Sequence, residues 1–109
     1  MTPDDRLYLT HIADCIARIE EYTAQGREHF MESHLVQDAV IRNFEIVGEA
    51  VKQISDETLD RTPEIPWHRI AAFRNVLIHG YMGINLSRVW NVIENDLHNL
   101  KEAVEYLLK

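Results

Sequence analysis

The chain has 109 residues, of which 46% are hydrophobic, and its formal net charge is -7 at pH 7. This length and apolar content predict a single domain over residues 1–109 with one core, and they exclude a second domain. The acidic balance argues against a protein that coats nucleic acid through a broad basic surface, but it does not exclude an enzyme that acts on RNA.

The first long helix predicted along the chain begins near Thr2 or Asp4, because Pro3 is tolerated in a first helical turn. It is expected to end near Gly26. Its apolar residues recur every three or four positions, a pattern typical of a helix with one buried stripe. The stripe consists of Leu9, Ile12, Cys15, Ile16, Ile19 and Tyr22.

A second long helix has the broadest apolar face in the chain, so we expect it to lie at the centre of the fold. Gly48, inside this helix, costs about 1 kcal/mol relative to alanine, which indicates that it permits close contact with another helix. The apolar face consists of Val36, Val40, Phe44, Val47, Val51 and Ile54, widened by Leu35, Ala39, Ile46 and Ala50.

The third long helix is predicted from about Pro66 to His79, since proline suits a first helical turn. Trp67 would pack at its start. The core side of this helix would consist of Ile70, Phe73 and Leu77, which are spaced by three and four residues.

The last segment is predicted to form one long helix, capped by Asn85 or Ser87. Its apolar stripe consists of Leu86, Trp90, Ile93, Leu97, Leu100, Val104 and Leu107. No alternating strand pattern accompanies these helices. The sequence therefore predicts an all-α fold, an antiparallel up-and-down four-helix bundle with a short extra helix or turn before the third long helix.

The single cysteine, Cys15, excludes an internal disulfide and suits a reducing compartment. The N-terminal residues 1–5 are acidic where a signal peptide is basic and apolar, and no apolar run reaches membrane-spanning length. We therefore expect a soluble cytoplasmic protein without membrane association.

One run of eight residues, from Arg74 to Tyr81, concentrates the side chains that suit chemistry on a phosphodiester. Arg74 offers a fork of donors that fits phosphate, His79 can act as a base near neutral pH, and Tyr81 offers a modifiable hydroxyl. Asn75 and His79 share a helix face, whereas Arg74 and His79 point about 140° apart on an ideal helix. Either the last turn loosens at Gly80, or two copies of the helix pool their residues across a dimer axis.

Structural alternatives remain for each of these residues. Arg74 can pair with Glu45 or Glu49 of the second helix, and His79 can simply cap the end of its own helix. Tyr81 can be a packed aromatic residue. For Arg42, a structural ion pair is the expected role.

The six histidines allow a metal-binding interpretation, but the paired Glu-x-x-His motifs of a di-iron bundle are absent from the sequence. A phosphate-cradling glycine loop is absent as well. We therefore expect no metal site and no cofactor.

The motif formed by Arg74, four residues, His79, one residue and Tyr81 resembles the signature of the HEPN ribonuclease superfamily, specifically of the HepT-like toxins. The resemblance continues in residues 42–50, at Trp67 and in the closing helix around Trp90, so it covers nearly the whole chain as one HEPN-type domain.

This resemblance implies a homodimeric, metal-independent endoribonuclease, the toxin of a type VII-like toxin-antitoxin system. Arg74 and His79 would be catalytic, with Asn75 in support, and RNA such as tRNA or mRNA would be the substrate. The antitoxin would be a minimal nucleotidyltransferase that transfers AMP to Tyr81 and so blocks the site. The alternative is a non-catalytic HEPN module that binds a nucleotidyltransferase partner or a nucleotide.

Overall fold

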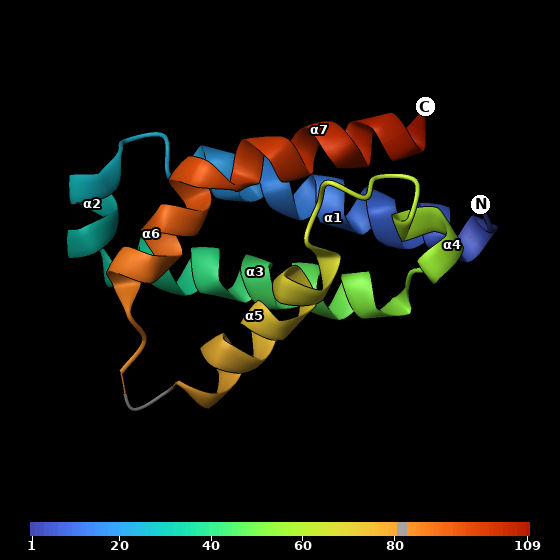
Figure 1. Ribbon diagram of the computed structural model, residues 1–109. Helices are drawn as coiled ribbons and strands as arrows, with labels where there is room; N and C mark the ends of the chain where they lie inside the picture. Colours follow the sequence, from blue (N-terminus) through green and yellow to red (C-terminus); the bar gives the residue numbers. More distant parts are fainter. Residues whose placement is uncertain (81–82) are drawn as a thin grey trace.

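The computed structural model describes residues 1–80 and 83–109, and its regular structure over these residues is entirely helical. Successive long helices run in opposite directions, as predicted for an up-and-down bundle (Figure 1). α3 packs between α1 and α5, and α7 lies along α1. The helices are α1 (Pro3–Tyr22), α2 (Arg27–Glu32), α3 (His34–Gln53), α4 (Asp56–Leu59), α5 (Trp67–His79), α6 (Leu86–Asn95) and α7 (Leu97–Leu108).

α1 begins where the sequence predicts. The Oγ1 atom of Thr2 accepts a hydrogen bond from the backbone N–H of Asp5 at 3.0 Å, and Pro3 occupies the first turn. The predicted stripe from Leu9 to Ile19 is buried. The helix ends at Tyr22, about one turn before the predicted end, because Gly26 adopts a φ of 93° and starts α2 instead. α2 was not predicted, since six residues with only Phe30 buried are too short to show a period.

A buried carboxylate joins the start of α1 to α4, the short helix that confirms the expected extra element before α5. Asp5 is 3% exposed and accepts hydrogen bonds from the backbone N–H of Ser55 at 3.0 Å, from Ser55 Oγ at 2.6 Å and from Thr58 Oγ1 at 2.6 Å. Burial alone would raise the pKa of this carboxyl, but the hydrogen bonds from Ser55 and Thr58 outweigh it and lower the pKa to about 2.

α3 is central, as expected, because it packs against both α1 and α5. Its residues Val40, Phe44, Val47 and Val51 are buried, but Leu35 is 82% exposed, so the prediction that Leu35 belongs to the apolar face is wrong. On a helix Leu35 points about 100° away from Val36, which carries it out of the buried stripe.

The prediction of one closing helix is wrong, because the segment bends between α6 and α7 at Asp96, where φ is -115°. The bend lets α7 follow α1 while α6 turns toward α2, where the rings of Phe30 and Trp90 lie 5.5 Å apart (Figure 1). Hydrogen bonds still cross the bend from Asp96 N to Val92 O and from Leu100 N to Asp96 O. The apolar residues therefore keep their spacing of three and four through the bend, and the sequence pattern gives no sign of it.

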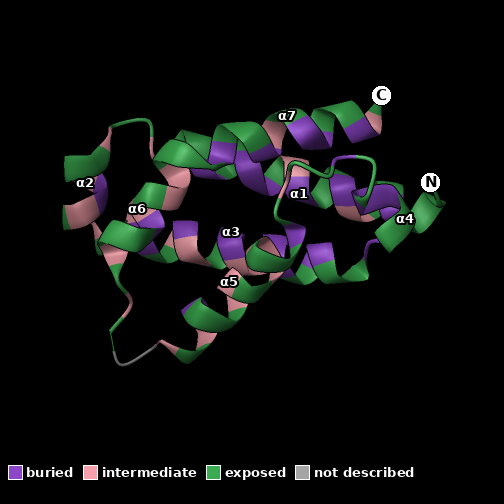
Figure 2. Cartoon of the chain, viewed as in Figure 1, coloured by how far each residue is buried: buried purple, intermediate pink, exposed green. Residues whose placement is uncertain are grey.

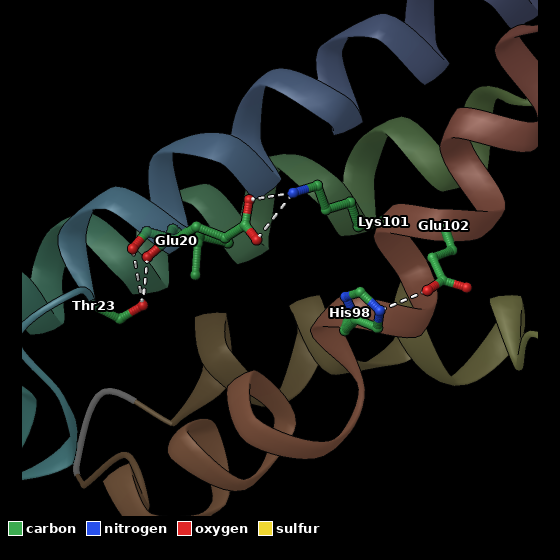
Figure 3. Close-up of polar contacts among 6 residues, drawn as sticks. Glu20, Thr23, His98, Lys101 and Glu102 are labelled. Carbon is green, nitrogen blue, oxygen red and sulfur yellow. Dashed lines mark hydrogen bonds and ion pairs between the residues drawn. The ribbon is translucent and has the colours of Figure 1, made fainter.

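α6 begins after Asn85, whose side chain accepts a hydrogen bond from the backbone N–H of Arg88 at 3.1 Å, which confirms Asn85 as the cap. At the α1–α7 contact, the Nζ atom of Lys101 lies 3.2 Å from a carboxylate oxygen of Glu20 (Figure 3). Both side chains are about 40% exposed, so this pair contributes little to stability.

α5 has few buried residues for its length, and it packs mainly against α3. Only Trp67 and Leu77 are fully buried in it, whereas the predicted core residues Ile70 and Phe73 are partly buried (Figure 2). Trp67 anchors the start of the helix, because its Nε1–H donates to Thr62 Oγ1 at 3.0 Å. No helix within the described residues is long and apolar enough to span a membrane.

Candidate functional site

Arg74 lies on the side of α5 that faces α3. Its Nε atom is 3.0 Å from Oε2 of Glu49, and the two side chains are 29% and 51% exposed. Of the two carboxylates that the sequence left open as partners, Glu49 is therefore the one that pairs with Arg74. The guanidinium makes one further contact within the described chain, from Nη1 to Oδ1 of Asn75 at 3.5 Å.

Gly48 allows α5 to approach α3 at Arg74. A Cβ atom placed on Gly48 would lie 2.6 Å from the Cβ atom of Arg74 and 3.4 Å from the carbonyl oxygen of Ile70. The first distance leaves no room for a methyl group, whereas the second is an ordinary contact. The expectation that Gly48 permits close helix contact is confirmed, and the residue that it accommodates is the arginine of the motif.

His79 lies on a different side of α5 from Arg74. The helix stays regular through His79 and ends at Gly80, so the last turn does not loosen in a way that would swing the imidazole toward Arg74. His79 follows Arg74 by five residues, so on a regular α-helix the two side chains point about 140° apart and the two Cα atoms lie about 7.5 Å apart along the helix axis. Asn75 and His79 are both exposed. Tyr81, the predicted acceptor of AMP, lies outside the described residues.

An open hollow of about 330 Å³ lies beside Arg74 and Glu49. It is bounded by one side each of α1, α3 and α5. The lining consists of Tyr8, His11, Arg42, Glu45, Ile46, Glu49, Ala50, Gln53, Arg74 and Ile78. The site thus mixes two guanidinium groups with two carboxylates, an arrangement that the linear motif does not reveal.

Arg42 lies on the exposed surface of α3 at this hollow. The structural ion pair that we expected for it is not formed among residues 1–80 and 83–109. Arg42 is therefore a cation at the edge of the hollow, whereas the sequence predicted a structural ion pair for it. Arg42, Glu45 and Glu49 follow one another at steps of three and four, so they share a face of α3. This spacing could have predicted that Arg42 lies at the hollow.

The described part of the chain holds no group of three or more His, Cys, Asp or Glu side chains that could bind a metal ion. Of the described histidines, His11 lines the hollow, whereas His79, at the end of α5, is not part of its lining. The chemistry that these residues can perform is acid-base catalysis and charge stabilisation.

Comparison with known proteins gives a consistent result. A family model described as "Ribonuclease HepT-like" matches residues 12–107. A Thermococcus cleftensis protein named "Probable ribonuclease HepT" is 41% identical over 103 residues, which cover 94% of each chain. A Methanocaldococcus jannaschii protein named "Gamma-glutamylcyclotransferase and putative RNase MJ0434" is 42% identical over 105 residues. The match covers 95% of this chain but only 47% of that longer protein. No solved structure matches the chain significantly.

Proposed function

The chain belongs to the family of HepT-like ribonucleases, and from this premise we propose that it is a metal-independent endoribonuclease toxin acting in the cytoplasm. The observation that carries the proposal is the placement of Arg74, which α3 holds at the edge of an open hollow by a 3.0 Å contact from Glu49. A partly exposed guanidinium beside a cavity is suited to an RNA phosphate. The spacing of Arg74, His79 and Tyr81, which resembles the HEPN signature, supports the same proposal.

The reaction follows from the side chains. His79 takes the proton of a ribose 2′-hydroxyl, and the 2′-oxygen forms a bond to the adjacent phosphorus while the bond from phosphorus to the 5′-oxygen breaks. Arg74 stabilises the extra negative charge on the phosphoryl oxygens, and Asn75 supports the site from the same helix face as His79. The products are a 2′,3′-cyclic phosphate and a 5′-hydroxyl. DNA is not cut, because it lacks the 2′-hydroxyl.

The active unit in this proposal is a homodimer. The 140° between Arg74 and His79 on a regular α5 supports this, since one chain cannot easily direct both side chains at one phosphate. Two copies of α5 facing each other across a two-fold axis would combine Arg74 of one subunit with the histidine of the other. The second histidine would then be available to protonate the leaving 5′-oxygen.

Regulation in this proposal is a covalent block of the same site. A minimal nucleotidyltransferase antitoxin of a type VII-like toxin-antitoxin system transfers AMP to the hydroxyl of Tyr81, two residues beyond His79. The added nucleotide brings bulk and negative charge close to the catalytic groups, which repels an RNA phosphate and covers the site. The substrate is RNA, with tRNA and mRNA as the candidates.

The test is cleavage of total RNA in EDTA by the unmodified protein, by His79→Ala and by Arg74→Ala, followed by analysis of the new RNA ends. We expect cyclic phosphate ends from the native protein alone. His98→Ala is the matched control, because His98 is also an exposed helical histidine and lies on α7, away from the hollow. If mass spectrometry shows an unmodified Tyr81 and the native protein still leaves RNA intact, the chain is a non-catalytic module that binds a nucleotidyltransferase or a nucleotide.

The composite site has its own test. Arg74→Ala and His79→Ala proteins are unfolded together, refolded as a mixture and assayed. If the site takes its arginine and its histidine from different subunits, half of the dimers hold one site with both its arginine and its base, and the mixture recovers up to about a quarter of the native activity, or less where the second histidine is needed as the acid. A mixture that dimerises but stays inactive would contradict this arrangement.

A further inference from the structure

We propose that Glu49 is a positioning residue for Arg74, which fixes the guanidinium by its inner nitrogen and leaves the outer nitrogens to bind the RNA phosphate. This inference rests on the proposed ribonuclease function and assigns a task to a residue outside the Arg-His-Tyr motif. Its basis is the contact between Glu49 Oε2 and Arg74 Nε at 3.0 Å.

The two residues that hold Arg74 are consecutive in α3. Gly48 seats the base of the side chain, because only a residue without a Cβ atom fits beside the Cβ atom of Arg74. Glu49 holds the other end at the guanidinium. An arginine side chain has many rotamers in solution, so a restraint at both ends removes most of the freedom that would otherwise be lost when substrate binds.

The hydrogen-bonding capacity of the guanidinium leaves room for substrate. Arginine carries five N–H donors in a plane, and the carboxylate of Glu49 lies against the Nε side of this plane as an ion pair at 3.0 Å. Within the described residues the terminal nitrogens make one contact, from Nη1 to Asn75 Oδ1, and its length of 3.5 Å is at the limit of a hydrogen bond. The edge formed by Nη1 and Nη2 can therefore bind two phosphate oxygens in the bidentate geometry that arginine favours.

The exposure of Arg74 and Glu49 indicates that their ion pair positions the arginine and does not stabilise the fold. The side chains of Arg74 and Glu49 are 29% and 51% exposed, so solvent screens the pair and it adds little to the stability of the chain. The competing possibility is that Glu49 occupies Arg74 in place of the phosphate and so inhibits the site. These two possibilities make opposite predictions for turnover when the carboxylate is removed.

Glu45 provides the matched control. It lies one turn before Glu49 on the same helix, it lines the same hollow, and it carries the same charge. Among the described residues, the ion pair of Arg74 goes to Glu49 and not to Glu45. A general effect of removing negative charge near RNA should therefore appear equally in both variants, whereas an effect on the position of Arg74 should appear in only one.

The experiment measures kcat and KM for an RNA oligonucleotide with the native protein, Glu49→Ala, Glu49→Gln and Glu45→Ala, together with the NMR signal of the Arg74 Nε–H. We expect Glu49→Ala to lower kcat by about ten- to a hundredfold, with an unchanged or lower KM, a native melting temperature and a shifted Nε–H signal. Glu49→Gln keeps an oxygen that can lie against Nε, so its kcat should stay within about threefold of native. Glu45→Ala removes the same charge from the hollow but not the ion pair of Arg74, so it should lower kcat less than Glu49→Ala does and should leave the Arg74 Nε–H signal unshifted.

Two results would overturn the inference while the ribonuclease function stands. One is a native or higher kcat for Glu49→Ala with a lower KM, which would make Glu49 a competitor of the phosphate. The other is an equal loss of kcat in Glu49→Ala and Glu49→Gln, which would assign the effect to charge alone. Failure of the ribonuclease function itself would look different, because the native protein would then cleave no RNA, and the inference would fall with it.

Discussion

Adding a single methyl group at Gly48 should displace the catalytic arginine. In Gly48→Ala the new Cβ would lie 2.6 Å from the Cβ of Arg74, whereas carbon atoms in contact prefer about 3.5–4.0 Å. The Cβ atom of Arg74 is bonded directly to the backbone of α5 and cannot rotate away, whereas the carbonyl oxygens of Ile70 and Ala71, at 3.4 and 3.5 Å, are in ordinary contact. α5 must therefore move away from α3 by about 1 Å.

We expect this movement to lower the free energy of unfolding by about 1–3 kcal/mol, as overpacking does in other cores. A displacement of about 1 Å at a reacting group can also cost about a hundredfold in rate. Urea unfolding followed by circular dichroism measures the first effect, and single-turnover cleavage of an RNA oligonucleotide measures the second. Gly83→Ala is the control, because a Cβ there would meet no atom of the described residues within 4 Å.

Two outcomes would refute this reasoning. If Gly48→Ala unfolds and cleaves as the native protein does, α3 and α5 are not in close contact at Arg74. If it is less stable but cleaves at the native rate, α5 has moved without displacing the groups that act on RNA. A loss in both measurements, with Gly83→Ala unaffected, is the expected result.

Asp5→Asn should lower the free energy of unfolding at pH 7 by about 2 kcal/mol, because lowering the pKa of Asp5 from 3.8 to about 2 corresponds to that amount. Asp4→Asn is the control, because Asp4 is exposed in the same helical turn and its replacement should change the free energy of unfolding little. The contribution of Asp5 is present above pH 3.8 and is lost as the pH falls toward 2, so urea unfolding of the native protein and of Asp5→Asn should converge over that range. Trp67→Phe removes the hydrogen bond to Thr62 Oγ1 and should cost about 1 kcal/mol in urea unfolding; a native midpoint would show that the bond contributes nothing net. Asn85→Ala removes the cap of α6 and should cost about 1 kcal/mol in the same measurement, unless another group replaces the lost acceptor.

The elements that the sequence predicted well are those that local rules determine. Thr2 and Asn85 cap helices because their side chains reach a backbone N–H three residues along, whatever the rest of the chain does. The bend at Asp96 escaped prediction because it depends on what α6 and α7 each pack against, while the apolar spacing continues across it. Leu35 was misplaced because an apolar residue at the edge of a stripe can face either way.

The candidate site shows the same division. The motif placed Arg74 and His79 on one helix, and the helical angle between them was calculable in advance. The partner of Arg74 was not, because Glu45 and Glu49 share a face of α3 and only the depth at which α5 packs, set at Gly48, decides between them. The hollow could not be predicted either, because its lining comes from three helices whose packing against one another the sequence does not give.

α5 packs against essentially one neighbour, α3, so it can open locally while the other helices stay folded. Local opening requires less free energy where few buried contacts must break, and α5 has only Trp67 and Leu77 fully buried. Its backbone amides should therefore exchange hydrogen faster than those of α1 and α3, through partial openings that leave the other helices folded. Each such opening separates Arg74 from Glu49 and dismantles the hollow, so the site can be lost and regained without a cycle of global unfolding.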